Sequence, residues 1–335
     1  MRILVTGGAG LIGSHYVRQV AAKVYPAFAQ ARLVVLDRLS YAGSWDNLSD
    51  ATDTGDVEVV HGDVADPSAV ERAMSGVDVV IHFAAESHVD RSITGGEEFV
   101  HTNVLGTQIV LEAARRHDVQ RLVQISTDEV YGSIKQGSWD EREPLAPSSP
   151  YSASKASADL LALAYYRTYG LPVCITRCSN NYGPNQFPEK MIPLFVTNLL
   201  DGLPIPLYGD GENVRDWLHV DDHCRGIQLV AESGRDGEVY HIGGGAELTN
   251  RQVVERLLSA TGRDWSWVQR VPDRPGHDRR YSLDYTKTAR ELGYQPRVDF
   301  ETGLAGTVHW YRKHRQWWEL RKGPQRQQGV DLPPR

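Results

Sequence analysis

The chain has 335 residues, of which 41% are hydrophobic and 24% charged, and its formal net charge is −7. This length exceeds what one hydrophobic core usually supports, so two domains or one elaborated domain are expected. The negative charge argues against a nucleic-acid or anionic-membrane partner, because both select for clustered Lys and Arg, but it leaves room for a local basic pocket that takes a phosphorylated substrate.

The first half of the chain alternates short β-branched runs with helical patterns. Strands are predicted at 2–6, 32–37, 57–62, 77–83, 120–126 and 172–177, and helices near 11–24, 67–75, 97–117 and 151–169. This alternation predicts right-handed crossovers and an α/β fold, a Rossmann-type doubly wound parallel sheet. Ligands of such sheets bind outside the carboxyl ends of the strands, so the residues that follow each strand are candidates for the site.

After residue 178 the alternation loosens and Pro and Gly multiply. We therefore expect a Rossmann domain over 1–178 and a smaller α/β substrate-binding domain over 179–320. A strand and a helix around 216–245 are expected to return to the first sheet, and a capped helix is expected over 249–262. The polar, Pro-containing segment 321–335 predicts a disordered tail.

Cysteine usage and the first residues indicate the compartment. The three cysteines, Cys174, Cys178 and Cys224, form no even set and no Cys-x-x-Cys pair, so neither a disulfide framework nor a zinc site is expected. The chain begins directly with a strand, without a signal segment, and no apolar run approaches about 18 residues. These features predict a cytoplasmic protein with no metal and no membrane association.

A glycine-rich turn links the first strand to the first helix. Gly7, Gly10 and Gly13 in "VTGGAGLIGSHYV" permit a tight turn and close approach of the backbone to a pyrophosphate at the helix N-terminus. Asp37 ends the second strand, where its carboxylate would accept hydrogen bonds from a ribose 2′-hydroxyl and repel a 2′-phosphate. This pattern favours NAD over NADP, although Arg38 beside it is of a type that can face a phosphate.

A tyrosine and a lysine lie four residues apart in "PYSASKASAD", on one face of a helix that is expected to begin at Pro150. The phenol of Tyr151 has an ordinary pKa of about 10, so it needs a nearby cation to act as a base. Lys155 would supply that charge and hold the nicotinamide ribose. Surface packing is the alternative for such a pair, but its position one loop after Thr127, at the end of a strand, favours a site.

These motifs together resemble an extended short-chain dehydrogenase/reductase of the nucleotide-sugar-modifying branch. Within that branch "FAAESHVDRSI", "STDEVYG", "RCSNNYGPNQFPEKMIP" and "DRPGHDRRYSLD" are similar to the dTDP-glucose 4,6-dehydratase family, over residues 1 to about 315. The resemblance implies conversion of dTDP-glucose to dTDP-4-keto-6-deoxyglucose with NAD regenerated in each turnover and retained.

The adjacent acids Asp128 and Glu129 fit that reaction, because elimination of water across C5 and C6 needs one ionised and one protonated carboxyl group. The resemblance implies that Glu129 is the base at C5 and Asp128 the acid at C6. It also implies that Tyr151 is the base for the C4 hydroxyl and that Thr127 hydrogen-bonds the C4 oxygen. Neighbours on a strand point to opposite faces, so both acids share a pocket only if the strand breaks before them, as Gly132 suggests.

The resemblance also implies a set of ligand contacts. Further cofactor contacts are Leu11, Ile12, Arg38, Ser40, Asp63, Val64, Ala84, Ala85, Thr102 and Asn181. For Asp63, a helix-capping role is equally open. Substrate contacts, besides Thr127, are Ser87, Asn180, Lys190, Met191, Pro206, Tyr208, Arg215, Asn250, Arg274 and His277. Exposed charge on a solvated face is the alternative for Lys190 and Arg215.

Two further expectations concern assembly and alternative functions. The helices near 97–117 and 151–169 carry apolar residues on more than one face, which predicts a homodimer through paired helices unless the second domain covers them. A nucleotide-sugar 4-epimerase would share the fold, NAD, Tyr151 and Lys155, but has no use for the acid pair. A 4,6-dehydratase of another nucleotide sugar and a non-enzymatic dinucleotide sensor are the remaining alternatives.

Overall fold

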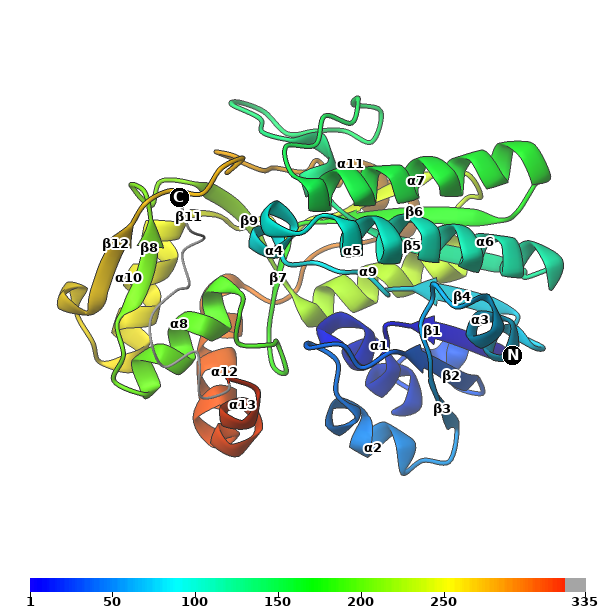
Figure 1. Cartoon of the computed structure of the whole chain (residues 1–335), viewed down its shortest axis with the longest axis horizontal. Helices are drawn as coiled ribbons and strands as arrows, with labels where there is room; N and C mark the ends of the chain where they lie inside the picture. The colour runs from blue at the N-terminus through cyan, green and yellow to red at the C-terminus, as the bar shows by residue number, and fades with distance from the viewer. Residues whose placement is uncertain (323–335) are drawn as a thin grey trace.

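A seven-stranded parallel sheet forms the centre of the larger of two lobes (Figure 1). The computed structural model describes residues 1–322. In the order β10-β6-β5-β4-β1-β2-β3, the strands are Val239–Ile242, Val173–Cys178, Arg121–Thr127, Val79–His82, Arg2–Thr6, Arg32–Asp37 and Val57–His61. The reversal of strand order at β1 and β4 confirms the predicted Rossmann-type fold.

Helices cover both faces of this sheet because successive strand residues point to opposite sides. Ile3 and Val5 of β1 pack with α1 (Leu11–Ala21) and α9 (Val220–Ser233) on one face. Leu4 packs on the other face with α3 (Pro67–Met74), α6 (Thr107–Arg116) and α7 (Pro150–Tyr169). The edge strand β3 is more exposed than its apolar sequence predicts, with Val59 38% exposed.

The helix predicted over 97–117 is divided into three parts. These are α5 (Glu97–Phe99), a π-helical turn (Val100–Gly106) and α6. The turn carries Asn103, whose side chain accepts a hydrogen bond from the main-chain N–H of Glu86 (2.8 Å) and donates to its carbonyl (3.0 Å). The turn therefore fixes the loop that follows β4, ahead of the short helix α4 (Val89–Thr94).

The second lobe has its own core. Three strands pair in the order β11-β9-β7 (Glu247–Thr249, Val214–His219 and Asn180–Tyr182), and β12 (Val268–Val271) pairs with β8 (Ile205–Tyr208). The helices α8 (Met191–Leu200), α10 (Asn250–Thr261), α12 (Phe300–Lys313) and α13 (Arg315–Lys322) surround these strands. Trp217, Leu257 and Trp318 are among the buried residues between them.

The chain passes between the lobes more than once. After β9 in the second lobe, α9 and β10 return to the first sheet, where β10 pairs with β6. The chain then re-enters the second lobe at β11 and α10. It comes back once more at α11 (Thr286–Leu292), which packs against β10. Helix α10 is capped as its sequence predicts, with a reciprocal hydrogen-bond pair between Thr249 and Gln252 and a left-handed Gly262 at its end.

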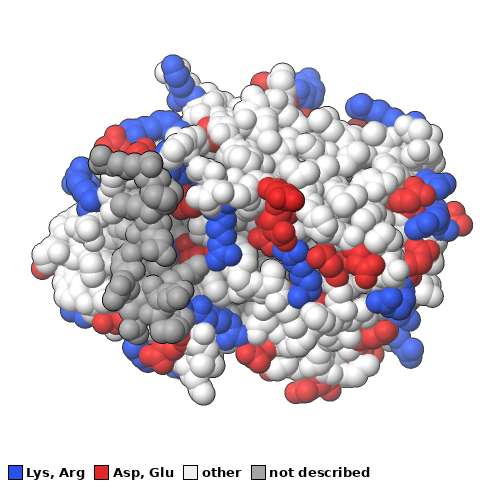
Figure 2. All heavy atoms as spheres, viewed as in Figure 1, with Lys and Arg blue, Asp and Glu red and all other residues white. Residues whose placement is uncertain are grey.

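Helix α13 extends through Lys322, two residues into the segment predicted as a tail. The rest of that segment, 323–335, lies outside the described residues. Among the described helices none combines the length and apolar character needed to cross a membrane. Acidic and basic side chains are interspersed over both lobes on the face viewed in Figure 2.

Candidate active site

A cleft of about 350 Å³ lies at the carboxyl ends of the first sheet and receives residues from both lobes. It is lined by all of the predicted cofactor residues, Gly7, Gly10, Leu11, Ile12, Gly13, Asp37, Arg38, Ser40, Asp63, Val64, Ala84, Ala85, Thr102, Tyr151, Lys155 and Asn181. The same cleft is lined by Thr127, Asp128, Glu129, Ser87, Asn180, Lys190 and Met191. The structure therefore brings together residues that are far apart in the sequence.

The glycine loop leaves room for a dinucleotide. Gly7 has φ +67°, and a Cβ on it would lie 2.6 Å from the main-chain nitrogen of Ala84, so no side chain fits there. Gly10 precedes α1 without any side-chain cap, which leaves the first N–H groups of the helix open to a ligand. The buried hydroxyl of Thr102, also in the cleft, has no partner within residues 1–322. These features fit the predicted NAD.

Asp37 supports the glycine loop as well as lining the cleft. Its two carboxylate oxygens accept hydrogen bonds from the main-chain N–H groups of Ala9 (2.9 Å) and Leu39 (2.8 Å). Burial raises the pKa of Asp37, and these two hydrogen bonds oppose the rise. Each oxygen retains a second lone pair, so the carboxylate can also accept from a ribose hydroxyl.

Arg38 is surrounded by carboxylates. Its guanidinium pairs with Asp63 (3.1 Å), Glu98 (2.7 Å) and Glu86. Three acids facing one guanidinium leave a net negative environment, which disfavours a 2′-phosphate and so removes the argument for NADP that Arg38 suggested. The capping alternative for Asp63 is wrong, because Asp66 caps α3 by accepting from the N–H of Ser68 at 2.9 Å.

The acid pair follows directly on the end of β5. The strand ends at Thr127, and Asp128–Tyr131 form a single 3-10 turn. The Thr127 hydroxyl accepts from the N–H of Glu129 (3.3 Å) and donates to Asp128 Oδ1 (3.2 Å). Gly132, at φ +80°, ends the turn. The strand thus breaks where the sequence requires, and both acids line the same cleft.

The two carboxyl groups have contrasting surroundings. Burial raises the pKa of Asp128 well above its ordinary range, and the charge of Glu129 raises it further. Burial also raises the pKa of Glu129, but the positive charges of Arg274, Arg215 and Lys190 oppose that rise. The surroundings therefore favour the protonated form more strongly at Asp128 than at Glu129.

Tyr151 and Lys155 lie one turn apart on α7, which begins at Pro150. Burial raises the pKa of Tyr151 well above its ordinary value, and the charge of Glu129 raises it further. A hydrogen bond with Thr127 opposes that rise. The Lys155 ammonium group donates to the carbonyl of Ile125 at 2.6 Å, and burial lowers the pKa of Lys155. The surroundings of the phenol therefore favour its protonated form.

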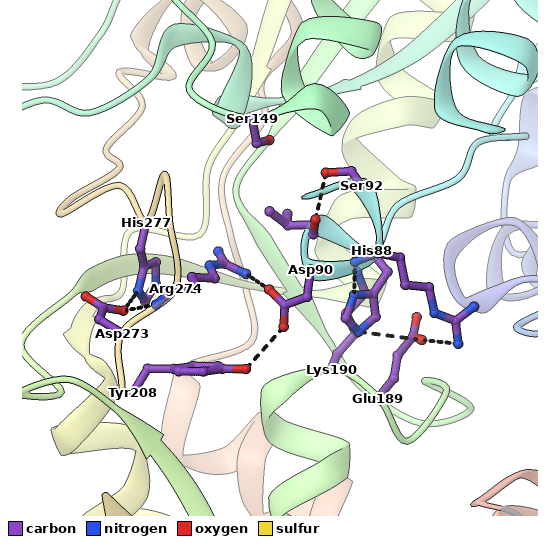
Figure 3. Close-up of polar contacts among 12 residues, drawn as sticks. His88, Asp90, Ser92, Ser149, Glu189, Lys190, Tyr208, Asp273, Arg274 and His277 are labelled. Carbon is purple, nitrogen blue, oxygen red and sulfur yellow. Dashed lines mark hydrogen bonds and ion pairs between the residues drawn. The ribbon is translucent and has the colours of Figure 1, made fainter. Parts of the chain in front are cut away.

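Six of the predicted substrate residues lie outside this cleft lining: Pro206, Tyr208, Arg215, Asn250, Arg274 and His277. Tyr208, Arg274 and His277 gather beside Lys190 in a polar group that also contains Asp90 and Asp273 (Figure 3). Tyr208 and Arg274 both donate to Asp90, and the His277 ring contacts Asp273 at 2.6 Å.

The remaining members of that set are buried in the second lobe. Pro206 lies within β8, and Asn250 is the first residue of α10. Arg215 is only 5% exposed, donates to the carbonyls of Val214 (2.8 Å) and Asp278 (3.0 Å), and stacks on Tyr281 at 4.2 Å. The solvated-face alternative is therefore wrong for Arg215.

Several lining residues were not predicted from the sequence. They include Glu86, Ser126, Gln186, Phe187, Glu189, Ile192 and Trp217. Glu189 precedes Lys190 in "PEKM", and Trp217 follows Arg215 by two residues on β9, so proximity to predicted residues was the signal available. Within residues 1–322 no cluster of three or more His, Cys, Asp or Glu side chains could hold a metal ion.

Comparisons with known proteins give a consistent result. The sequence profile of the family described as GDP-mannose 4,6 dehydratase matches residues 4–307. A dTDP-glucose 4,6-dehydratase from Streptomyces antibioticus is 60% identical over 337 residues, covering 100% of this chain and 99% of the relative. The crystal structure of the dTDP-glucose 4,6-dehydratase DesIV from Streptomyces venezuelae, with NAD bound, is 60% identical with a TM-score of 0.95 over 96% of this chain and 100% of that one. A UDP-glucuronic acid 4-epimerase from Bacillus cereus is more distant, at 27% identity and a TM-score of 0.87 over 93% of this chain and 99% of that one.

Proposed function

The chain belongs to the GDP-mannose 4,6-dehydratase family, and from that premise we propose how its cleft carries out the dTDP-glucose 4,6-dehydratase reaction. The enzyme converts dTDP-D-glucose to dTDP-4-keto-6-deoxy-D-glucose and water. NAD, when bound, accepts hydride from C4 of the hexose and returns it to C6, so it is regenerated in each turnover. The protein must therefore move protons at three positions, the C4 hydroxyl, C5 and the C6 hydroxyl.

Tyr151 takes the proton of the C4 hydroxyl, and Thr127 hydrogen-bonds the C4 oxygen. Because burial opposes ionisation of the phenol, this role depends on a nearby positive charge, which Lys155 carries one helical turn away. The hydrogen bond from Lys155 to the Ile125 carbonyl keeps the ammonium group beside the substrate end of the cleft. The product of this step is a C4 ketone, which acidifies the proton on C5.

Glu129 then removes the C5 proton while Asp128 gives its proton to the C6 hydroxyl, which leaves as water. The C5–H and C6–O bonds break, a C5–C6 double bond forms, and one proton moves to Glu129 as another leaves Asp128. When C6 is reduced, Glu129 returns its proton to C5, and the proton that Tyr151 took from the C4 hydroxyl balances, through solvent, the one that Asp128 gave.

The observation that carries this proposal is the contrast between the two acids. The charges of Arg274, Arg215 and Lys190 favour ionisation of Glu129. Of these three only Arg215 favours ionisation of Asp128, whose pKa is raised by burial and by the charges of Glu129 and Asp216.

The second lobe, built from 179–320 apart from the α9, β10 and α11 segments that return to the first lobe, grips the nucleotide diphosphate, and residues 1–178 supply most of the proposed NAD contacts. Arg215, Arg274 and Lys190 supply positive charge beside Glu129, and Arg is suited to bidentate contact with phosphate. The neutral ring of His277, whose pKa burial lowers to about 4, serves as a hydrogen-bonding group there. Ser87, Asn180, Met191, Pro206, Tyr208 and Asn250 complete the proposed substrate contacts.

The protein acts as a homodimer in the cytoplasm. The π-helical turn and α7 carry exposed apolar side chains, with Val100 57%, Leu105 44% and Leu160 60% exposed. Figure 1 shows α6 and α7 side by side in the first lobe, away from the helices of the second. Large exposed apolar side chains on neighbouring helices favour an isologous helix pair. Leu160→Lys should convert the dimer to a monomer in size-exclusion chromatography with light scattering, and a monomeric wild type would refute the dimer.

Incubation with dTDP-glucose tests the reaction. The 4-keto product absorbs in alkali, whereas a 4-epimerase leaves no such chromophore. Parallel incubations with UDP-glucose and GDP-glucose measure the choice of nucleotide, and Tyr151→Phe serves as the inactive control. No chromophore with any of the three substrates would refute the dehydratase assignment.

A further inference from the structure

Asp90 has no part in the proton transfers, yet it joins the two lobes at the substrate site. It lies on α4 of the first lobe, and its carboxylate reaches the second (Figure 3). Its Oδ1 accepts from Nη1 of Arg274 at 2.8 Å and its Oδ2 accepts from the Tyr208 hydroxyl at 3.3 Å. Both partners belong to the proposed nucleotide-sugar contacts.

The helix that carries Asp90 is itself anchored. The Arg91 guanidinium lies over the Tyr41 ring at 3.6 Å and pairs with Glu189 at 3.3 Å. The His88 ring accepts from the N–H of Arg91 at 3.4 Å and faces Glu189 at 3.7 Å. These contacts hold α4 between Tyr41 and Glu189. Asp90, on the same helix, makes its two side-chain hydrogen bonds to residues of the second lobe.

Asp90 binds one end of the Arg274 guanidinium and leaves its Nε–H without a hydrogen-bond partner within residues 1–322. Asp90 accepts a hydrogen bond from only one nitrogen of Arg274, Nη1. The Nε proton, which shares the opposite edge with one proton of Nη2, is buried and has no partner within residues 1–322. Two parallel N–H groups on one edge match a pair of phosphate oxygens. The main chain of Arg274 is also held, because its N–H donates to Asp273 at 2.9 Å.

We propose that Asp90 is a positioning residue, which holds Arg274 so that its Nε–Nη2 edge meets the diphosphate of the nucleotide sugar. The proposal rests on the function proposed above. It predicts that Asp90 favours diphosphate binding although its own charge has the same sign as that of the ligand. A carboxylate that merely occupied the phosphate position would have the opposite effect, because its removal would then tighten binding.

A double-mutant cycle on the NAD-loaded protein separates these roles, with dTDP as the probe in isothermal titration calorimetry. Asp90→Asn should raise the Kd for dTDP about tenfold, as expected when an oriented charged hydrogen bond is lost. In an Arg274→Gln background the same change should alter Kd by less than about twofold, since the group it positions is gone. With dTDP-glucose, Asp90→Asn should raise KM and leave kcat within about twofold.

Asp210→Asn is the matched control. Like Asp90→Asn, it removes one negative charge and breaks an Asp–Arg pair, here with Arg279 at 2.9 Å in the second lobe. Both side chains of that pair are more than half exposed, and the pair lies outside the site. It should leave the Kd for dTDP unchanged.

Three results would overturn the proposal: tighter dTDP binding by Asp90→Asn, no change in its Kd, or an equal loss in the Arg274→Gln background. If Asp90→Asn fails to fold, Asp90→Glu decides the question. Its extra methylene displaces the guanidinium, so a raised Kd at an unchanged Tm supports positioning, and an unchanged Kd refutes it. Wild-type turnover of dTDP-glucose is measured alongside, so that a failure of the dehydratase assignment is distinguished from a failure of the role of Asp90.

Discussion

Glu129→Gln should separate the oxidation at C4 from the elimination that follows. The change preserves the shape of the side chain but removes the proposed base at C5. Loss of a positioned general base typically costs 10²–10⁴ in rate, or about 3 to 5 kcal/mol in the barrier to elimination. The Glu129 charge is also the largest electrostatic influence that raises the pKa values of Tyr151 and Asp128. Its removal makes the phenol easier to ionise, so oxidation of C4 should proceed at least as fast as in the wild type.

Single-turnover stopped-flow measurement of enzyme-bound NADH, paired with quenched-flow assay of the alkali-absorbing product, checks this expectation. In Glu129→Gln the NADH absorbance should rise toward one equivalent per active site and persist, while product forms slowly. Glu143→Gln, at an exposed carboxylate in the loop after the acid pair, should match the wild type in both signals. Rapid product formation by Glu129→Gln would refute its role as the base at C5. Absence of NADH would show that Glu129 is needed for the oxidation itself.

Three other changes test the remaining parts of the site. Tyr151→Phe should lower product formation about a thousandfold with no NADH signal, while the Kd for dTDP stays within about twofold; normal NADH accumulation would rule out the phenol as the base. Gly7→Ala should lower the free energy of unfolding by at least about 2 kcal/mol more than Gly293→Ala. Both glycines have φ near +68°, but only at Gly7 would the new Cβ clash with the main chain of Ala84. Equal losses of stability in urea titrations would contradict the argument from this steric clash. Asp128 holds a proton in the native state that the unfolded chain releases, so the free energy of unfolding should fall as pH rises from the ordinary carboxyl range toward its raised pKa. Asp128→Asn should flatten that fall, and an unchanged slope would contradict the raised pKa.

The parts of the fold that were predicted correctly depend on local sequence. Apolar runs of β-branched residues fix the strands of the first sheet, and the glycine spacing after β1 fixes the loop beside Ala84. The caps at Thr249 and Gly262 follow from hydrogen bonds and backbone angles within a few residues. The break at Thr127 also has a local cause, since its hydroxyl bonds the second residue after it.

The parts that were missed depend on contacts between distant segments. Arg38 alone suggests a phosphate ligand, and only the fold brings three carboxylates from later segments around it. The hydrogen bond from the Lys155 ammonium group to the carbonyl of Ile125 was likewise not predicted, because it joins a helix to a strand 30 residues earlier. Asp90 lies within "FAAESHVDRSI", and its partner Arg274 is 184 residues further along the chain. No periodicity or spacing signals a pair of that kind.

The return of the chain from the second lobe to the first affects biosynthesis and engineering of the protein. Helix α1 packs on α9, with the Tyr16 hydroxyl donating to Gln228 at 2.7 Å, and β6 pairs with β10. During synthesis, the three second-lobe strands β7, β8 and β9 therefore leave the ribosome before α9 and β10, which the first lobe needs to complete its fold. A truncated protein ending at Cys178 would expose the edge of β6 and one side of α1 to water. A chimaera that exchanges the first lobe must consequently carry three separate segments: the N-terminal segment that ends with β6, the segment of α9 and β10, and the segment of α11.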